Sequence, residues 1–168
     1  HFTIHAPENW QVISNQPTPT PVAIEQGHTW DFSPTPRISS YITALIAGPY
    51  REVRSELTSS SGRVIPLGIF ARASLFDYLD SDYIFDITAK GFAFFEDKFG
   101  VAYPFEKYDQ LFVPEFNAGA MENAGAVTFT ESYIFRSHVT DAVRERRVVT
   151  ILHELAHMWF GDLVTMRW

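Results

Sequence analysis

The feature that most constrains this chain is the segment His-Glu-Leu-Ala-His at 153–157, which lies within the largely apolar run 148–160. Such a run predicts a helix meant for burial. Residues four apart on an α-helix differ by about 40° around the axis and about 6 Å along it. His153 and His157 therefore leave the same face of the predicted helix, and Glu154 lies at the rim of that face.

A charged side chain on an apolar helix needs a partner, because an unpaired buried carboxylate is costly. A divalent metal held by His153 and His157, with a water molecule that Glu154 can bond, would meet that need. The alternative is that both are core histidines bonded to backbone carbonyls and that Glu154 pairs with an arginine. A catalytic zinc takes about three protein ligands and leaves one position for water. The third ligand must lie elsewhere, and no upstream residue is identified by spacing alone.

Composition limits the function classes. The 168 residues are 46% hydrophobic, enough for a core, and the net charge of −7 argues against nucleic-acid binding. Without cysteine, a metal must be held by His, Asp or Glu, and a reducing compartment is favoured. No run approaches the ~18 apolar residues of a membrane span. We therefore expect a cytoplasmic protein with no nucleic-acid and no membrane partner. Because the chain begins with His1 rather than Met, we interpret it as an internal piece of a longer protein.

Patterns along the rest of the chain predict an α+β fold. Apolar residues at three- and four-residue steps predict helices from about 80 to 99 and from about 141 to 160. Runs rich in β-branched and aromatic residues predict strands. These predicted strands are 37–48, a pair joined by a turn at 58–62 with 63–73 as its returning strand, 110–116 and 126–135.

A second candidate site is the segment Asn-Ala-Gly-Ala-Met-Glu-Asn-Ala-Gly at 117–125. Its small residues let the backbone come close to a ligand, and Glu122 supplies the one charge. On composition alone, the favoured interpretation is a small-residue loop with a surface glutamate.

Taken together, GAMEN at 119–123 and HELAH at 153–157 closely resemble the M1 family of zinc aminopeptidases, the gluzincin aminopeptidase N group. The resemblance continues through 98–116 and 159–168, and the motifs look most like those of a bacterial member. It implies that residues 1–48 are the carboxyl-terminal part of a β-rich amino-terminal domain. Residues 49–168 would then be the first part of a thermolysin-like catalytic domain.

The resemblance also implies the roles of the site residues. His153 and His157 become zinc ligands, and Glu154 becomes the general base that activates water. Glu122 becomes the anchor for the free α-amine of a peptide substrate. The remaining GAMEN residues become substrate-binding residues; they are Gly119, Ala120, Met121 and Asn123.

Two departures qualify the resemblance. Ala124 follows GAMEN where many relatives carry a large aromatic residue, so we expect a more open wall beside the first substrate side chain. The family's third zinc ligand would fall at position 176, beyond Trp168, and a tyrosine that steadies the transition state lies further on. We therefore expect weak zinc binding and no appreciable activity from these 168 residues alone, with Leu155, Trp159 and Phe160 partly uncovered.

The function expected for the parent protein is zinc-dependent removal of amino-terminal residues from peptides. Two alternatives stay open. One is a zinc endopeptidase, for which GAMEN would be a coincidence, and the other is a non-catalytic scaffold of the same fold.

Overall fold

The computed structural model describes residues 1–166 and has an α+β fold built on a mixed five-stranded sheet. Its strands, in spatial order, are β6 (Tyr50–Thr58), β7 (Val64–Arg72), β8 (Tyr108–Val113), β10 (Ala126–Thr130) and β9 (Ala120–Met121). The inner strands β7, β8 and β10 run parallel, and β6 and β9 are antiparallel edge strands. Residues 167 and 168, the end of the predicted catalytic segment 49–168, lie outside the described part.

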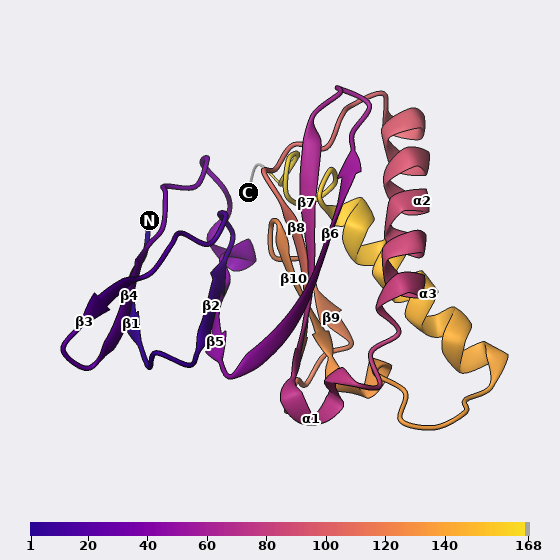
Figure 1. Cartoon of the computed structure of the whole chain (residues 1–168). Coiled ribbons are helices and arrows are strands. Elements are labelled where there is room, and N and C mark those ends of the chain that lie inside the picture. Colours follow the sequence, from indigo (N-terminus) through magenta and orange to yellow (C-terminus); the bar gives the residue numbers. More distant parts are fainter. Residues whose placement is uncertain (167–168) are drawn as a thin grey trace.

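Two long helices, α2 (Ser81–Phe99) and α3 (Asp141–His157), pack side by side against one face of this sheet (Figure 1). A short helix, α1 (Ala73–Phe76), follows β7. Both long helices form at the predicted positions, although α3 ends before the predicted 160. No helix within residues 1–166 is long and apolar enough to cross a membrane.

The strands before Gly48 pair only with one another. They form a three-stranded sheet and a two-stranded sheet on the side of the main sheet away from α2 and α3 (Figure 1). Their bounds are β1 (Thr3–Ala6), β2 (Gln11–Ser14), β3 (Val22–Ile24), β4 (Gly27–Asp31) and β5 (Leu45–Gly48), with the 3₁₀ turn η1 (Ser40–Ile42) before β5. An apolar cluster nevertheless spans both parts, and it comprises Ile13, Ala44, Phe70, Leu111 and Ala126. The domain division at 48/49 therefore stays a prediction.

The end of α2 shows how local sequence sets an element. Gly100 adopts a left-handed conformation, φ 65°, and its N–H bonds to the carbonyl of Glu96, which closes the helix. The Glu96 carboxylate accepts hydrogen bonds from the Ser59 hydroxyl, the Ser60 N–H and the Tyr103 N–H at 2.5–2.7 Å. The hydrogen bonds of this buried carboxylate tie the β6–β7 turn to α2.

The main core lies between the helices and the sheet. Gly91 on α2 allows the close approach of α3, since a Cβ there would lie 2.7 Å from Leu152 and 2.8 Å from Leu155. Trp159 contacts Phe92 and Phe99 of α2, with ring centroids 6.3 and 5.7 Å apart.

The expectation that apolar side chains at the end of α3 are partly exposed holds for only one of the three residues. Leu155 is 0% exposed and Trp159 is 2% exposed because α2 covers them, so the expectation for these two residues is wrong. Phe160 is 57% exposed, as expected. Val149 is 58% exposed, so α3 buries one stripe rather than its whole surface.

Three predicted strands are shorter in the structure. Only Leu45–Gly48 of 37–48 is a strand, because residues 40–42 form η1. The strand predicted at 110–116 ends at Val113, since Pro114 lacks an N–H and Glu115 takes φ 51°. The one predicted at 126–135 ends at Thr130, whose hydroxyl accepts the Ser132 N–H and starts a 3₁₀ turn, η2 (Glu131–Tyr133).

Candidate metal and peptide site

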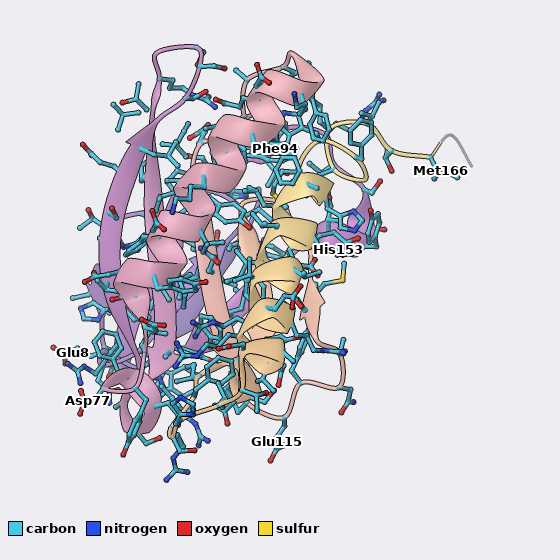
Figure 2. The ribbon with its side chains drawn as sticks, turned by 90° about the vertical axis from the view of Figure 1, so that its right-hand side faces the viewer. Glu8, Asp77, Phe94, Glu115, His153 and Met166 are labelled. Atoms are coloured by element: carbon cyan, nitrogen blue, oxygen red, sulfur yellow. The ribbon has the colours of Figure 1, made fainter. Side chains whose placement is uncertain are left out.

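The two histidines of α3 converge as the helical spacing predicts. The Nε2 atoms of His153 and His157 are 3.1 Å apart, and His153 lies on the side of α3 that faces away from α2 (Figure 2). The Nδ1 atom of His157 is 2.9 Å from the carbonyl oxygen of Phe160. A proton on that Nδ1 leaves the Nε2 lone pair available, which is the state a metal ligand needs.

The turn after α3 supplies that carbonyl. The helix ends at His157, three residues before the predicted end at 160. Gly161 then takes φ 124°, and a Cβ at this position would lie 3.2 Å from His157 Nδ1 and 3.2 Å from the Tyr41 hydroxyl. The turn therefore requires glycine both for its backbone angle and for its lack of a side chain.

Glu154 lies next to the converging histidines. It is 5% exposed, and its Oε2 has no hydrogen-bond partner among the described residues. Burial raises the pKa of Glu154 to about 7, the charge of Glu122 adds to the rise, and His157 opposes it. A carboxylate with a pKa near neutral and a free oxygen can take up a proton at physiological pH.

The first two residues of the GAMEN segment form another wall of the same site, whereas Met121, Glu122 and Asn123 are not among the residues that line it. Gly119 and Ala120 line an open cleft of about 660 Å³ together with His153 and Glu154. Ala120 and Met121 make up β9, the outer strand of the sheet, and half-buried Glu122 follows it. The fold thus brings together two motifs that are about thirty residues apart in the sequence.

Asn123 and Ala124 turn away from the cleft. The Asn123 amide is buried and donates to the Thr128 hydroxyl at 3.2 Å and to the Ala126 carbonyl at 3.4 Å. Ala124 is 2% exposed, and its N–H bonds to the carbonyl of Ile42. Ala124 is therefore buried and does not line the cleft, so the structure gives no support to the expectation that this residue opens the cleft wall.

Sequence reasoning missed several polar residues around the site. Buried Lys107 donates to the carbonyl of Gly125 at 2.7 Å and pairs with Asp109 at 2.8 Å. Burial lowers the pKa of Lys107, and the charge of Asp109 opposes that change. Asp162 is 6% exposed, and neither carboxylate oxygen has a hydrogen-bond partner among the described residues. Only one feature of the sequence could have pointed to these residues, namely that they lie in the segments 98–116 and 159–168 that resemble the family.

A further missed residue, Asn15, connects the GAMEN segment to the amino-terminal strands. Its Nδ2 donates to the carbonyls of Ile42 and Ala124, both at 2.9 Å, and its Oδ1 accepts the Ala44 N–H at 3.0 Å. The side chain is 5% exposed. A polar residue directly after the apolar strand β2 gave no hint of this role.

The described residues supply two candidate metal ligands, the imidazoles of His153 and His157. Within residues 1–166, no group of three or more His, Asp or Glu side chains could hold a metal ion. The convergent Nε2 atoms and the unpartnered Glu154 oxygen nevertheless fit part of a zinc site. The expected third ligand at position 176 is outside the sequence.

Comparisons with known proteins agree with the two motifs. Residues 83–168 match the Peptidase family M1 domain. The chain is 64% identical over 167 residues to Aminopeptidase N of Streptomyces lividans, which covers 99% of this chain and 19% of that protein. It is 37% identical over 173 residues to Aminopeptidase N of Rattus norvegicus, covering 100% of this chain and 18% of that protein. It is also 37% identical over 172 residues to Aminopeptidase Ey of Gallus gallus, covering 99% of this chain and 17% of that protein.

The chain thus spans about a fifth of the length of the curated relatives it matches. The family match covers α3 and most of α2, the two helices that pack against the sheet, and includes both motifs of the cleft. On this evidence the chain belongs to peptidase family M1.

Proposed function

We propose that the whole protein carrying this chain is a zinc-dependent aminopeptidase. The observation that carries the proposal is the pairing of His153 and His157, with Nε2 atoms 3.1 Å apart, beside the unpartnered oxygen of Glu154. The same cleft contains Gly119 and Ala120 of the GAMEN segment.

His153 and His157 would hold the metal, with a third ligand from outside these 168 residues. Zinc, when bound, lowers the pKa of water and polarises a carbonyl group. The carbonyl of Phe160 orients His157, and that contact supports its role as a ligand.

Glu154 would act as the general base. It lies between the two histidines in the sequence and has an oxygen without a hydrogen-bond partner among the described residues, so it can accept a proton from water and return it to the leaving amine. Because α3 is a rigid element packed on α2, the carboxylate keeps its position relative to both imidazoles.

Peptide binding would use the edge of β9 that pairs with no other strand among residues 1–166. An edge strand offers unpaired backbone groups to an extended peptide, and Gly119 adds little bulk there. Glu122 would hold the substrate's α-ammonium group by charge. A free amine held at a fixed distance from the histidines would select the first peptide bond for cleavage.

The test compares free and N-acetylated peptides as substrates of the whole protein. We expect cleavage of the first bond only when the amine is free. Glu122→Ala should lower kcat/KM for free-amine peptides by about 100-fold, since it removes a charged hydrogen-bond partner, and should leave the zinc content unchanged.

Other outcomes separate the alternatives. Cleavage of internal bonds in acetylated peptides would favour a zinc endopeptidase, and absence of any hydrolysis in the zinc-loaded protein would favour a scaffold. Peptides with a free amino terminus as partners and a cytoplasmic location belong to the same proposal. The arrangement of residues 1–48 and 49–168 as parts of two domains, the second of them thermolysin-like, is likewise proposed.

A further inference from the structure

We propose that residues 39–44, the spacer segment, fix the distance between residues 122–125, the Glu122 loop, and the turn after α3, residues 158–164, whose Phe160 carbonyl orients His157. The segment contains η1 and lies before β5, outside both motifs. This inference rests on the proposed function and deepens it, because that distance would decide which peptide bond is cut.

One end of the spacer segment holds the Glu122 loop. The carbonyl of Ile42 accepts the N–H of Ala124 at 3.3 Å and the Nδ2 of Asn15 at 2.9 Å. The same Nδ2 donates to the carbonyl of Ala124 at 2.9 Å. Asn15 also fixes the spacer segment itself by accepting the N–H of Ala44. A single buried amide therefore joins the spacer segment to the residue two positions after Glu122.

The other end contacts the turn after α3. The hydroxyl of Tyr41 donates to the carbonyl of Gly161 at 3.4 Å, and Ser39 is 3.2 Å from the hydroxyl of Thr165. A second hollow, of about 730 Å³, is lined by residues 39–41 together with His157 and Phe160. The spacer segment thus reaches the turn whose Phe160 carbonyl bonds to His157.

Spacing across the cleft has a direct functional meaning. The Glu122 loop comes from the sheet and His157 comes from α3, so their separation depends on how these elements are braced. A misplacement of about 1 Å between reacting groups can cost about 100-fold in rate. Within the described residues, the spacer segment contacts both the loop and the turn through named hydrogen bonds, which makes it a positioning element.

The experiment measures the ratio of kcat/KM for α-alanyl and β-alanyl anilides with the whole zinc-loaded protein. The β-alanyl substrate has one more methylene, so its amine lies up to about 1.5 Å further from the carbonyl. We expect the parent to prefer the α-alanyl anilide strongly. Asn15→Ala should lower α-alanyl turnover by about 10- to 100-fold and β-alanyl turnover much less, which narrows the ratio. Tyr41→Phe, which removes only a hydroxyl from a half-exposed residue, should narrow it by about threefold.

Ser14→Ala is the matched control. The buried Ser14 hydroxyl donates to the carbonyl of Ala44, the last residue of the spacer segment, at 2.7 Å. Ser14→Ala therefore removes one hydrogen bond to the spacer segment but leaves in place its bonds to Ala124 and to the turn after α3. This variant should keep the parent ratio although it loses a buried hydrogen bond next to Asn15.

The possible results are separable. The proposed role of the spacer segment is supported if the α-alanyl to β-alanyl ratio of kcat/KM narrows in Asn15→Ala and in Tyr41→Phe but not in Ser14→Ala. The proposal is overturned if the ratio is unchanged in Asn15→Ala or in Tyr41→Phe, or if it narrows equally in Ser14→Ala. If Asn15→Ala does not fold, Tyr41→Phe against Ser14→Ala decides.

A second measurement does not depend on turnover. Amide hydrogen exchange at Ala124 and at residues 160–162 should be faster in Asn15→Ala than in Ser14→Ala. Equal exchange rates in the two variants, at Ala124 and at residues 160–162 alike, would overturn the proposed role of the spacer segment. A parent that cleaves no anilide contradicts the proposed function, and hydrogen exchange still tests the spacer in that case.

Discussion

Replacement of Gly161 by alanine tests the link between the turn after α3 and metal binding. Gly161 has φ 124°, a conformation that residues with a Cβ rarely adopt. The new methyl group would lie 3.2 Å from His157 Nδ1 and 3.2 Å from the Tyr41 hydroxyl, and neither neighbour can move without losing a hydrogen bond. The turn should therefore shift, and the Phe160 carbonyl with it.

The magnitude follows from the contact that is lost. A backbone held in an unfavourable conformation costs about 1–3 kcal/mol. Loss of a group that orients a metal-bound histidine lowers metal affinity by about 10- to 100-fold, which corresponds to about 1.4–2.8 kcal/mol. We expect the zinc dissociation constant of the whole protein to rise by that factor. Turnover at saturating zinc should change much less, because Glu154 and Glu122 are untouched.

The assay is competition for zinc against a fluorescent chelator, with aminoacyl-anilide turnover followed over the same range of free zinc. Gly62→Ala is the control, since Gly62 has φ 81°, a Cβ there meets nothing within 4 Å, and it lies in the β6–β7 turn. Gly62→Ala likewise adds a Cβ at a residue with positive φ, and its zinc affinity should be unchanged. Parent-like zinc affinity in Gly161→Ala, or an equal loss in Gly62→Ala, would refute the reasoning.

Three further predictions concern the acidic residues and the chain itself. Glu154→Gln should keep zinc but lower turnover by about 10² to 10⁴, because the amide cannot accept a proton; metal analysis and kcat check this, and turnover within a few-fold of the parent contradicts it. The 168-residue chain should bind zinc far more weakly than the whole protein and show no aminoacyl-anilide turnover, since residues 1–166 offer no group of three ligands. Stoichiometric zinc together with full activity in the 168-residue chain would contradict this prediction. Burial raises the pKa of Asp162 to about 8, and the charges of Glu122 and Glu154 add to the rise. The folded metal-free protein then binds more protons than the unfolded chain between about pH 4 and about pH 8, so its stability falls as the pH rises through this range. Asp162→Asn should flatten that fall, as measured by hydrogen exchange of residues 158–164 in EDTA, and an unchanged pH dependence would exclude Asp162 as its source.

Local periodicity was sufficient to predict the helices and the convergence of His153 and His157. These features depend on residues three or four apart, so the sequence holds their geometry directly. The extents of the strands were less predictable. Pro114, Glu115 and the hydroxyl of Thr130 end two of them by backbone effects that an apolar run does not reveal.

The parts of the site that depend on long-range contacts could not be predicted. Asn15 bonds to Ala124 across more than a hundred residues, and nothing in either local sequence indicates the other. Burial of Trp159 likewise depends on Phe92 and Phe99, which the sequence places in a different helix. Such contacts follow from the packing of elements, and the sequence pattern describes only the elements.

The apolar cluster across the 48/49 boundary affects how such proteins can be recombined. Ile13 and Ala44 pack with Phe70, Leu111 and Ala126, and Asn15 bonds to Ala124 on the far side of the same boundary. A chimera joined at Gly48 between two family members would separate residues that pack together in this chain. The residues on both sides of the 48/49 boundary would have to be exchanged together. A junction at Gly48 resembles a linker in the sequence, but it lies beside an apolar cluster that both sides share.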